Sequence, residues 1–369
     1  MPNIAYRMNE WKYTFDPVSK ADWIRQITTD LKQKPFESLT SEWWEGEPRW
    51  PILHNEDMDD EVVRLPDFLF SQPPHITEQI STISSSPESV NQTILEALQF
   101  GTQSIILQVA SSEKKFNPTW INDVRLDWIT FQVEHNGHSA TTVSSFINAF
   151  PEHTYFRVIR ESSSPLLSSF MSGENTSSAV EISALRFIYR FPSQGIWTKK
   201  TINTLNTLLD DLEQWQALGF ETSSFFNQCT LVLEADLDYF KQVIQTRTLH
   251  VLWQNIIHHF SNEAASSNVR YLETHIEQNK NEKPDLFLIR ASMSALAASL
   301  AGTGSLCIHQ SLDDSVPMFY RRINRNIQHL LDLECGMYKG VDPMSGAYSL
   351  DFHVKGWATK IWEGLNPCK

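Results

Sequence analysis

The chain has 369 residues and a formal net charge of −14, with an isoelectric point near 5.3, which argues against partners such as nucleic acids or anionic membranes. No run of 18 apolar residues could span a membrane, and the polar residues 1–11 lack the apolar core of a signal peptide. The four cysteines show no CxxC spacing, so we expect reduced thiols in a cytoplasmic protein, and neither a zinc site nor a disulfide framework: Cys229, Cys307, Cys335 and Cys368.

Residues 1–70 differ in composition from the rest of the chain. They hold five of the twelve tryptophans and six prolines, and their one helical pattern covers residues 19–32, with Ser19 as its N-cap. A segment so poor in periodic structure cannot build its own core. We therefore predict an arm that covers another surface, which is either the remainder of this chain or a partner subunit.

From residue 75 onward, short apolar runs alternate with helical patterns. Eight strands are expected, and most of them are followed by a helix. Eight such units within roughly 250–300 residues are typical of a TIM barrel, while a doubly wound parallel sheet is the alternative that the pattern alone leaves open. The expected strands are 75–80, 104–109, 127–133, 154–159, 182–191, 228–233, 269–276 and 306–309, and the expected helices are 87–101, 198–218, 238–260, 285–300 and 317–333.

Three motifs follow one another near the end of this pattern. They read Ala-Gly-Thr-Gly-Ser-Leu-Cys at 301–307, Arg-Ile-Asn-Arg-Asn at 322–326 and Asp-Pro-Met-Ser-Gly-Ala-Tyr at 342–348. In this order they resemble the last βα units of the methylmalonyl-CoA mutase family, and residues 240–253 resemble another of its helices. The resemblance implies an α/β fold in which residues 71–369 form a (β/α)8 barrel with a C-terminal helix and no cobalamin-binding domain.

The same resemblance implies that the catalytic side chains are missing. Gly304 and Cys307 stand where the family has a Gln and a His of its active pocket, and Phe187 stands where it has the His that polarises the substrate carbonyl. A phenyl ring cannot donate a hydrogen bond or a proton to an oxygen. Residues 65–74 also lack the Arg and Tyr with which the family holds its acyl-CoA. We therefore expect no catalytic residue, with Phe187, Gly304 and Cys307 as vestigial pocket positions.

A further match concerns the cofactor. Asp351, His353 and Gly356 have the spacing of the family's cobalamin motif, in which the His is the lower axial ligand of cobalt. Only thirteen residues follow Gly356, whereas the nucleotide-binding domain needs about 100. We interpret the match as a coincidence within the C-terminal helix. The resemblance then implies a chain without cofactor or metal, whose partner is a large catalytic subunit that holds adenosylcobalamin, or a homodimer when it is alone.

Other polar groups have ordinary structural interpretations. The Gly302 to Gly304 stretch is expected to be a tight turn rather than a phosphate loop, because it precedes a strand. Three arginines on one helix are interpreted as surface or interface residues, with a CoA phosphate site as the alternative: Arg321, Arg322 and Arg325.

Three functions remain open at this point. The first is a non-catalytic small subunit that stabilises a chain interconverting methylmalonyl-CoA and succinyl-CoA, and the second is a catalytic barrel that uses a cobalamin domain on a separate chain. The third is a repurposed barrel, for which we expect an open pocket. Arg and Tyr side chains at the barrel axis would favour the second function. We expect instead a filled core, because the predicted inward positions are bulky: Ile105, Leu107, Ile129, Phe131, Phe156, Val158, Phe187, Val232 and Leu306.

Overall fold

The chain divides into two compact units, Met1–Val62 and Val63–Lys369, and the second unit thus begins earlier than residue 71, where the composition changes. The computed structural model describes residues 16, 18–32, 34–50, 52–58, 65, 67–83, 85–135, 140–160, 183–261, 271–279, 281–309, 318–338 and 340–365.

The first unit is built from short elements, of which helix α1 is the longest. Ser19 and Asp22 form a capping box at its start, since each side chain accepts a hydrogen bond from the backbone N–H of the other. The helix predicted at residues 19–32 is thereby confirmed. The elements of this unit are α1 (Lys20–Asp30), the strands β1 (Ser41–Glu42) and β2 (Pro48–Arg49), and the 3-10 helices Phe36–Leu39, Trp44–Gly46 and Asn55–Asp57.

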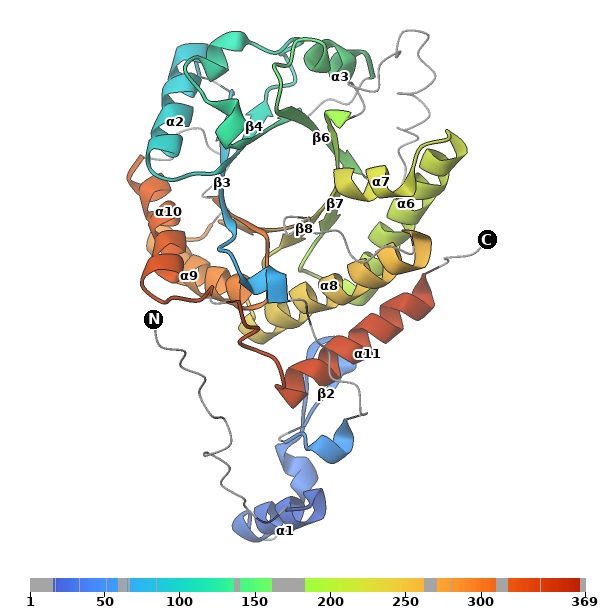
Figure 1. The fold of residues 1–369 in the computed structure, drawn as a ribbon. Helices are drawn as coiled ribbons and strands as arrows, with labels where there is room; N and C mark the ends of the chain where they lie inside the picture. The colour runs from blue at the N-terminus through green and yellow to red at the C-terminus, as the bar shows by residue number, and fades with distance from the viewer. Residues whose placement is uncertain are drawn as a thin grey trace, which may run out of the picture. The chain divides into compact units, whose positions relative to one another are not determined.

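The second unit contains a closed barrel of eight parallel strands, which Figure 1 shows as a ring surrounded by helices. Strands that follow one another in the chain are neighbours in the ring, and the last strand pairs with the first, where Leu306 lies beside Ile76. The strands are β3 (His75–Ser81), β4 (Ser104–Val109), β5 (Thr130–His135), β6 (Thr154–Arg160), β7 (Leu185–Phe191), β8 (Cys229–Glu234), β9 (Leu272–Glu277) and β10 (Ser305–His309).

The helices of this unit lie outside the ring (Figure 1). The last of them packs against α8 and α6. They are α2 (Pro87–Gln99), α3 (Ala140–Ile147), α6 (Trp197–Ala217), α7 (Thr222–Gln228), α8 (Tyr239–Ser261), α9 (Pro284–Leu300), α10 (Met318–Leu333) and α11 (Tyr348–Gly364), with 3-10 helices at Asp67–Phe70, Pro118–Ile121 and Leu126–Trp128.

The predicted TIM barrel is confirmed, and pairing between β10 and β3 excludes an open doubly wound sheet. All eight predicted strands and the five barrel helices are present, with ends that differ by a few residues. Helices α3 and α7 were not predicted. Helix α7 has only seven residues, and such a short apolar pattern gives no clear helical period.

The predicted inward positions are wrong for most of the strands. Phe156 packs against Phe146 of α3 with 6.0 Å between ring centroids, and Phe187 packs against Trp215 of α6 at 5.9 Å. Both phenylalanines therefore face the helices rather than the axis. By strand alternation and lateral pairing, the same holds for Ile105, Leu107, Phe131, Val158 and Leu306.

Of the remaining two positions, Val232 does lie on the inner face, in register with Arg190 and Glu273, whereas Ile129 precedes β5. The error has a physical cause. Strands of a TIM barrel are buried on both faces, so their apolar runs do not alternate clearly. A shift of one residue in the assumed phase then moves every side chain to the other face.

Candidate functional site

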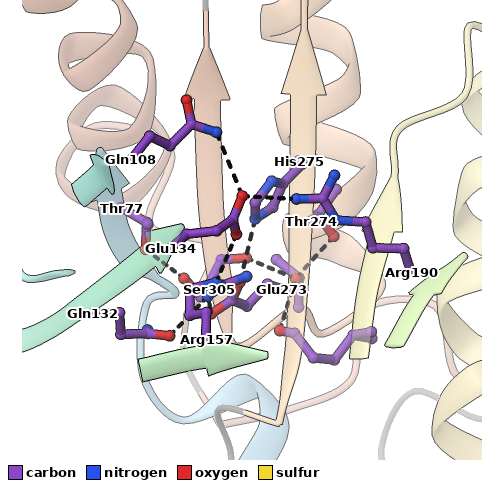
Figure 2. A network of polar contacts seen from close by, with 12 residues as sticks. Thr77, Gln108, Gln132, Glu134, Arg157, Arg190, Glu273, Thr274, His275 and Ser305 are labelled. Carbon is purple, nitrogen blue, oxygen red and sulfur yellow. Dashed lines mark hydrogen bonds and ion pairs between the residues drawn. The ribbon is translucent and has the colours of Figure 1, made fainter. Parts of the chain in front are cut away.

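The inner face of the barrel is polar and charged. Arg157 of β6, which is 0% exposed, extends across the ring and meets carboxylates from β5 and β9. Figure 2 shows the side chains that converge there. This group is called the axial network below, and it consists of Gln108, Gln132, Glu134, Arg157, Arg190, Glu273 and His275.

Arg157 donates to three different side chains. Its Nη1 and Nη2 donate to the two oxygens of Glu273 at 3.1 and 3.0 Å, and its Nε donates to Glu134 at 3.2 Å. Nη1 also donates to Gln132 at 2.8 Å. The guanidinium is thus held by a two-point contact on one side and by a second carboxylate on the other, a geometry that favours arginine over lysine.

From this centre the axial network continues toward the carboxyl ends of the strands. The second oxygen of Glu134 accepts hydrogen bonds from Arg190 at 3.1 Å and from Gln108 at 3.5 Å. The Arg190 side chain is 37% exposed. It therefore forms the accessible end of the network, at the barrel face where TIM-barrel enzymes carry their active sites.

The charges of the network stabilise one another. Burial by itself raises the pKa of the Glu273 carboxyl, but the Arg157 guanidinium and a hydrogen bond from His275 outweigh it and hold that pKa well below its usual range. Burial likewise lowers the pKa of Arg157, and the charges of Glu273 and Glu134 more than offset this effect. Arg157 and Glu273 consequently form a charged pair in the barrel interior, and Glu134 is a second ion-pair partner of the same guanidinium.

The three vestigial positions predicted from the sequence do not form a common site. Phe187 belongs to the outer core, as described above. Gly304 lies in the turn before β10, where its N–H donates to Leu272 and its carbonyl accepts from His75. Only Cys307 faces the barrel interior, beside Thr77 and His275. Burial and the nearby Glu273 charge raise the pKa of its thiol, so a reactive thiolate is not favoured there.

His353 lies in α11 and is 4% exposed, and burial lowers its pKa. Helix α11 packs against α8 and α6. Of the three arginines of α10, Arg321 and Arg325 both form ion pairs with Glu78, and Arg325 is buried, while Arg322 is exposed. The sequence-based surface interpretation therefore fails for Arg325.

The axial network was not predicted from the sequence, although one feature of the sequence indicated buried charge. The strand that contains Arg157 reads Thr-Tyr-Phe-Arg-Val-Ile-Arg, and a charged residue inside such a buried run is seldom accommodated without a partner of opposite charge.

Among the residues that the structure describes, no cluster of three or more His, Cys, Asp or Glu side chains could hold a metal ion. In the same part of the chain, no helix is long and apolar enough to cross a membrane.

The fold and the axial network define an α/β-barrel protein, and comparison with known proteins shows which proteins it resembles. The family model described as methylmalonyl-CoA mutase matches residues 198–368. The methylmalonyl-CoA mutase of Rhizobium meliloti is 30% identical over 166 residues, which are 42% of this chain and 23% of that protein. The methylmalonyl-CoA mutase small subunit of Porphyromonas gingivalis is 22% identical over 95% of this chain and 62% of that protein.

The chain is thus similar to methylmalonyl-CoA mutases, over residues 198–368 by the family model and over nearly its whole length by the small subunit. It spans less than two thirds of the length of either relative. Among solved structures, 7,8-dihydropteroate synthase from Vibrio fischeri covers 71% of this chain with a TM-score of 0.37 and 9% identity. The barrel assignment itself rests on the closed order of the eight strands.

Proposed function

We propose that this chain is a non-catalytic subunit of the small-subunit type, which stabilises a cobalamin-binding mutase chain that interconverts methylmalonyl-CoA and succinyl-CoA. The observation that carries the proposal is the axial network. A ligand that occupied the barrel axis would have to separate Arg157 from Glu134 and Glu273 and leave buried carboxylates without a counter-charge. Such a separation costs several kcal/mol.

Similarity also supports a partner. The Porphyromonas gingivalis relative, which matches nearly the whole chain, is named a small subunit, and a relative from Propionibacterium freudenreichii is named a large subunit and matches over 43% of this chain. We assign adenosylcobalamin to such a large partner chain. The imidazole of the axial network, His275, is engaged with Glu273 and is therefore not free to ligate cobalt.

One feature favours a second candidate function, the catalytic barrel that uses a cobalamin domain on another chain. Arginine side chains do reach the barrel interior, among them Arg157 and Arg190, and Arg190 is partly exposed at the carboxyl face. An anionic acyl-CoA group could pair with Arg190 without disturbing Arg157. The apolar interior expected from the sequence is thus replaced by a charged one, in which Arg190 is accessible from the carboxyl face.

An isomerase assay separates the two candidates. The purified chain, given adenosylcobalamin and methylmalonyl-CoA, should form no succinyl-CoA, and the same chain mixed with a cobalamin-binding large subunit should add no activity that depends on Arg190. The test compares the turnover of the mixture containing the Arg190→Met variant with that of the mixture containing wild type. Turnover by the pure chain, or a mixture whose turnover falls at least tenfold with Arg190→Met, would establish a catalytic barrel instead.

We also propose that His353 does not ligate cobalt. Its ring is 4% exposed in a helix packed against two others, and the two oxygens of Asp351, which would orient the ring, have no hydrogen-bond partner. Titration of the chain with adenosylcobalamin should leave the visible absorption spectrum of the free cofactor unchanged. A spectral change that is abolished in His353→Ala would contradict this expectation, while His258→Ala, at an exposed histidine, serves as the control.

A further inference from the structure

Helices α9 and α10 each carry a second apolar stripe on the side away from the barrel. Along each stripe, successive residues are alternately three and four positions apart in the sequence, which is the pattern of a coiled-coil seam. The α9 stripe consists of Leu286, Ile289, Met293, Leu296 and Leu300. The α10 stripe consists of Phe319, Ile323, Leu330 and Leu333, with the polar Asn326 at its centre.

These stripes are distinct from the faces that α9 and α10 bury against the strands. The inward face of α9, with Phe287, Ala291 and Ala295, is fully buried. The stripes, in contrast, are largely exposed: Leu286 by 58%, Ile289 by 66%, Met293 by 51%, Phe319 by 55%, Leu330 by 52% and Leu333 by 77%. A helix that is apolar on both sides is normally covered on both sides.

The two stripes form one surface. Helices α9 and α10 pack against each other, and the partly buried Leu296 and Ile323, one from each stripe, pack on the same core cluster. At roughly 60–100 Å² for each half-exposed side chain, the six exposed members and the adjacent Met318 offer about 400–700 Å² of apolar surface. An interface of standard size buries about 800 Å² on each partner, somewhat more than half of it apolar.

The α10 stripe is also symmetric about its centre. If two copies of α10 pack antiparallel with Asn326 facing Asn326, then Phe319 meets Leu333 and Ile323 meets Leu330 of the other copy. An isologous contact requires this reciprocity. The two central amides could donate to and accept from each other, as a buried Asn does in a coiled-coil seam. Neither stripe contains a charged residue, so two copies of this surface do not repel each other.

We propose that a second copy of this chain covers the α9–α10 surface, through a two-fold contact in which α10 packs antiparallel to its counterpart with Asn326 near the axis. The inference does not depend on the proposed function, because it concerns only the outer surface of α9 and α10. It would hold equally for a catalytic barrel.

The first test measures the oligomeric state of the full chain by analytical ultracentrifugation. Wild type should be a dimer, and Leu330→Glu/Leu333→Glu should weaken dimerisation at least 100-fold, because each copy would place two carboxylates against the apolar Ile323 and Phe319 of the other. Both leucines are more than half exposed, so the circular dichroism spectrum should not change. Leu237→Glu, at an apolar residue that is 70% exposed outside both stripes, is the matched control and should remain dimeric.

A second test reports the geometry without destabilising the contact. In a chain with Cys335 and Cys368 replaced by Ser, Asn326→Cys should form an inter-chain disulfide on mild oxidation. The control is Arg322→Cys, one turn away on the same helix. In the antiparallel arrangement its two copies lie about 12 Å apart along the axis, beyond the roughly 7 Å between Cα atoms that a disulfide can bridge.

Three outcomes would overturn the proposal. They are a monomeric wild-type chain at 50 µM or above, a dimer that survives Leu330→Glu/Leu333→Glu, and equal cross-linking of the two cysteine variants. A wild-type monomer that binds a large mutase subunit through Leu330 would assign the surface to that partner rather than to a second copy.

Discussion

The Arg157→Met variant is expected to lose about 3–5 kcal/mol of unfolding free energy. Arg157 is 0% exposed and is the counter-charge for Glu273 and Glu134, which lie on nearly opposite sides of the ring. Methionine fills a similar volume but leaves two carboxylates in the barrel interior without their main partner. Urea denaturation followed by tryptophan fluorescence measures the loss.

Two further variants distinguish loss of charge pairing from loss of packing. Arg186→Met removes another inward arginine, which stacks on Tyr155 and donates to backbone carbonyls, so its cost should stay near 1 kcal/mol. Neutralising the carboxylates as well, in Arg157→Met/Glu134→Gln/Glu273→Gln, should restore at least half of the lost stability. A loss below 1 kcal/mol for Arg157→Met would mean that the axial network does not hold the barrel together.

The barrel could be predicted from the sequence because its signal is local. Each strand is a short apolar run bounded by turn residues, and its type depends little on the rest of the chain. Which side chains of a strand point to the barrel axis, in contrast, depends on the structure that surrounds the strand. Phe156 and Val158 differ from Arg157 in polarity, yet the assumption that apolar residues point inward placed them at the axis. In this barrel the helices supply the apolar surroundings, and the axis takes the charges.

The site could not be predicted because its partners are far apart in the chain. Arg157 and Glu273 are separated by 116 residues, and no sequence pattern specifies which strands face each other across a barrel. The motif that contains Gly304 and Cys307 indicated a family resemblance but gave no indication of the charged centre. The apolar stripes on the surface of α9 and α10 have helical spacing and could be recognised in the sequence. Whether the barrel or a partner buries them can be decided only once the inward face of each helix is known.

Stability of the protein should fall as the pH is lowered from 7 toward 4, with His250 as a main cause. This residue of α8 is 0% exposed. Its Nε2–H donates to the carbonyl of Gly302 at 3.0 Å, which leaves Nδ1 to accept from the Tyr271 hydroxyl. Burial and the neighbouring Arg247 charge lower the pKa of His250 to about 3, although Asp342 acts in the opposite direction.

The sign follows from proton counts. Below about pH 6.5 the unfolded chain protonates this histidine while the folded chain does not, so each further pH unit costs about 1.4 kcal/mol until the folded pKa is approached. The total at pH 4 is about 3 kcal/mol for His250 alone. His309, whose pKa burial lowers to about 4, and His353, also lowered by burial, act in the same direction. Glu273 acts in the same direction only below about pH 5, where the unfolded carboxyl begins to take up a proton that the folded one, with its lowered pKa, does not.

His250→Gln isolates the contribution of one group, since a glutamine amide can donate to Gly302 and accept from Tyr271 without titrating. Unfolding free energies from urea denaturation at pH 5.0, 5.5 and 6.0 should show a pH slope that is smaller than that of wild type by about 1.4 kcal/mol per unit. His258→Gln, at an exposed position of the same helix, should keep the wild-type slope. Equal slopes in His250→Gln and wild type would show that His250 is protonated or solvated in the folded barrel, and that its contacts with Gly302 and Tyr271 do not exclude the proton.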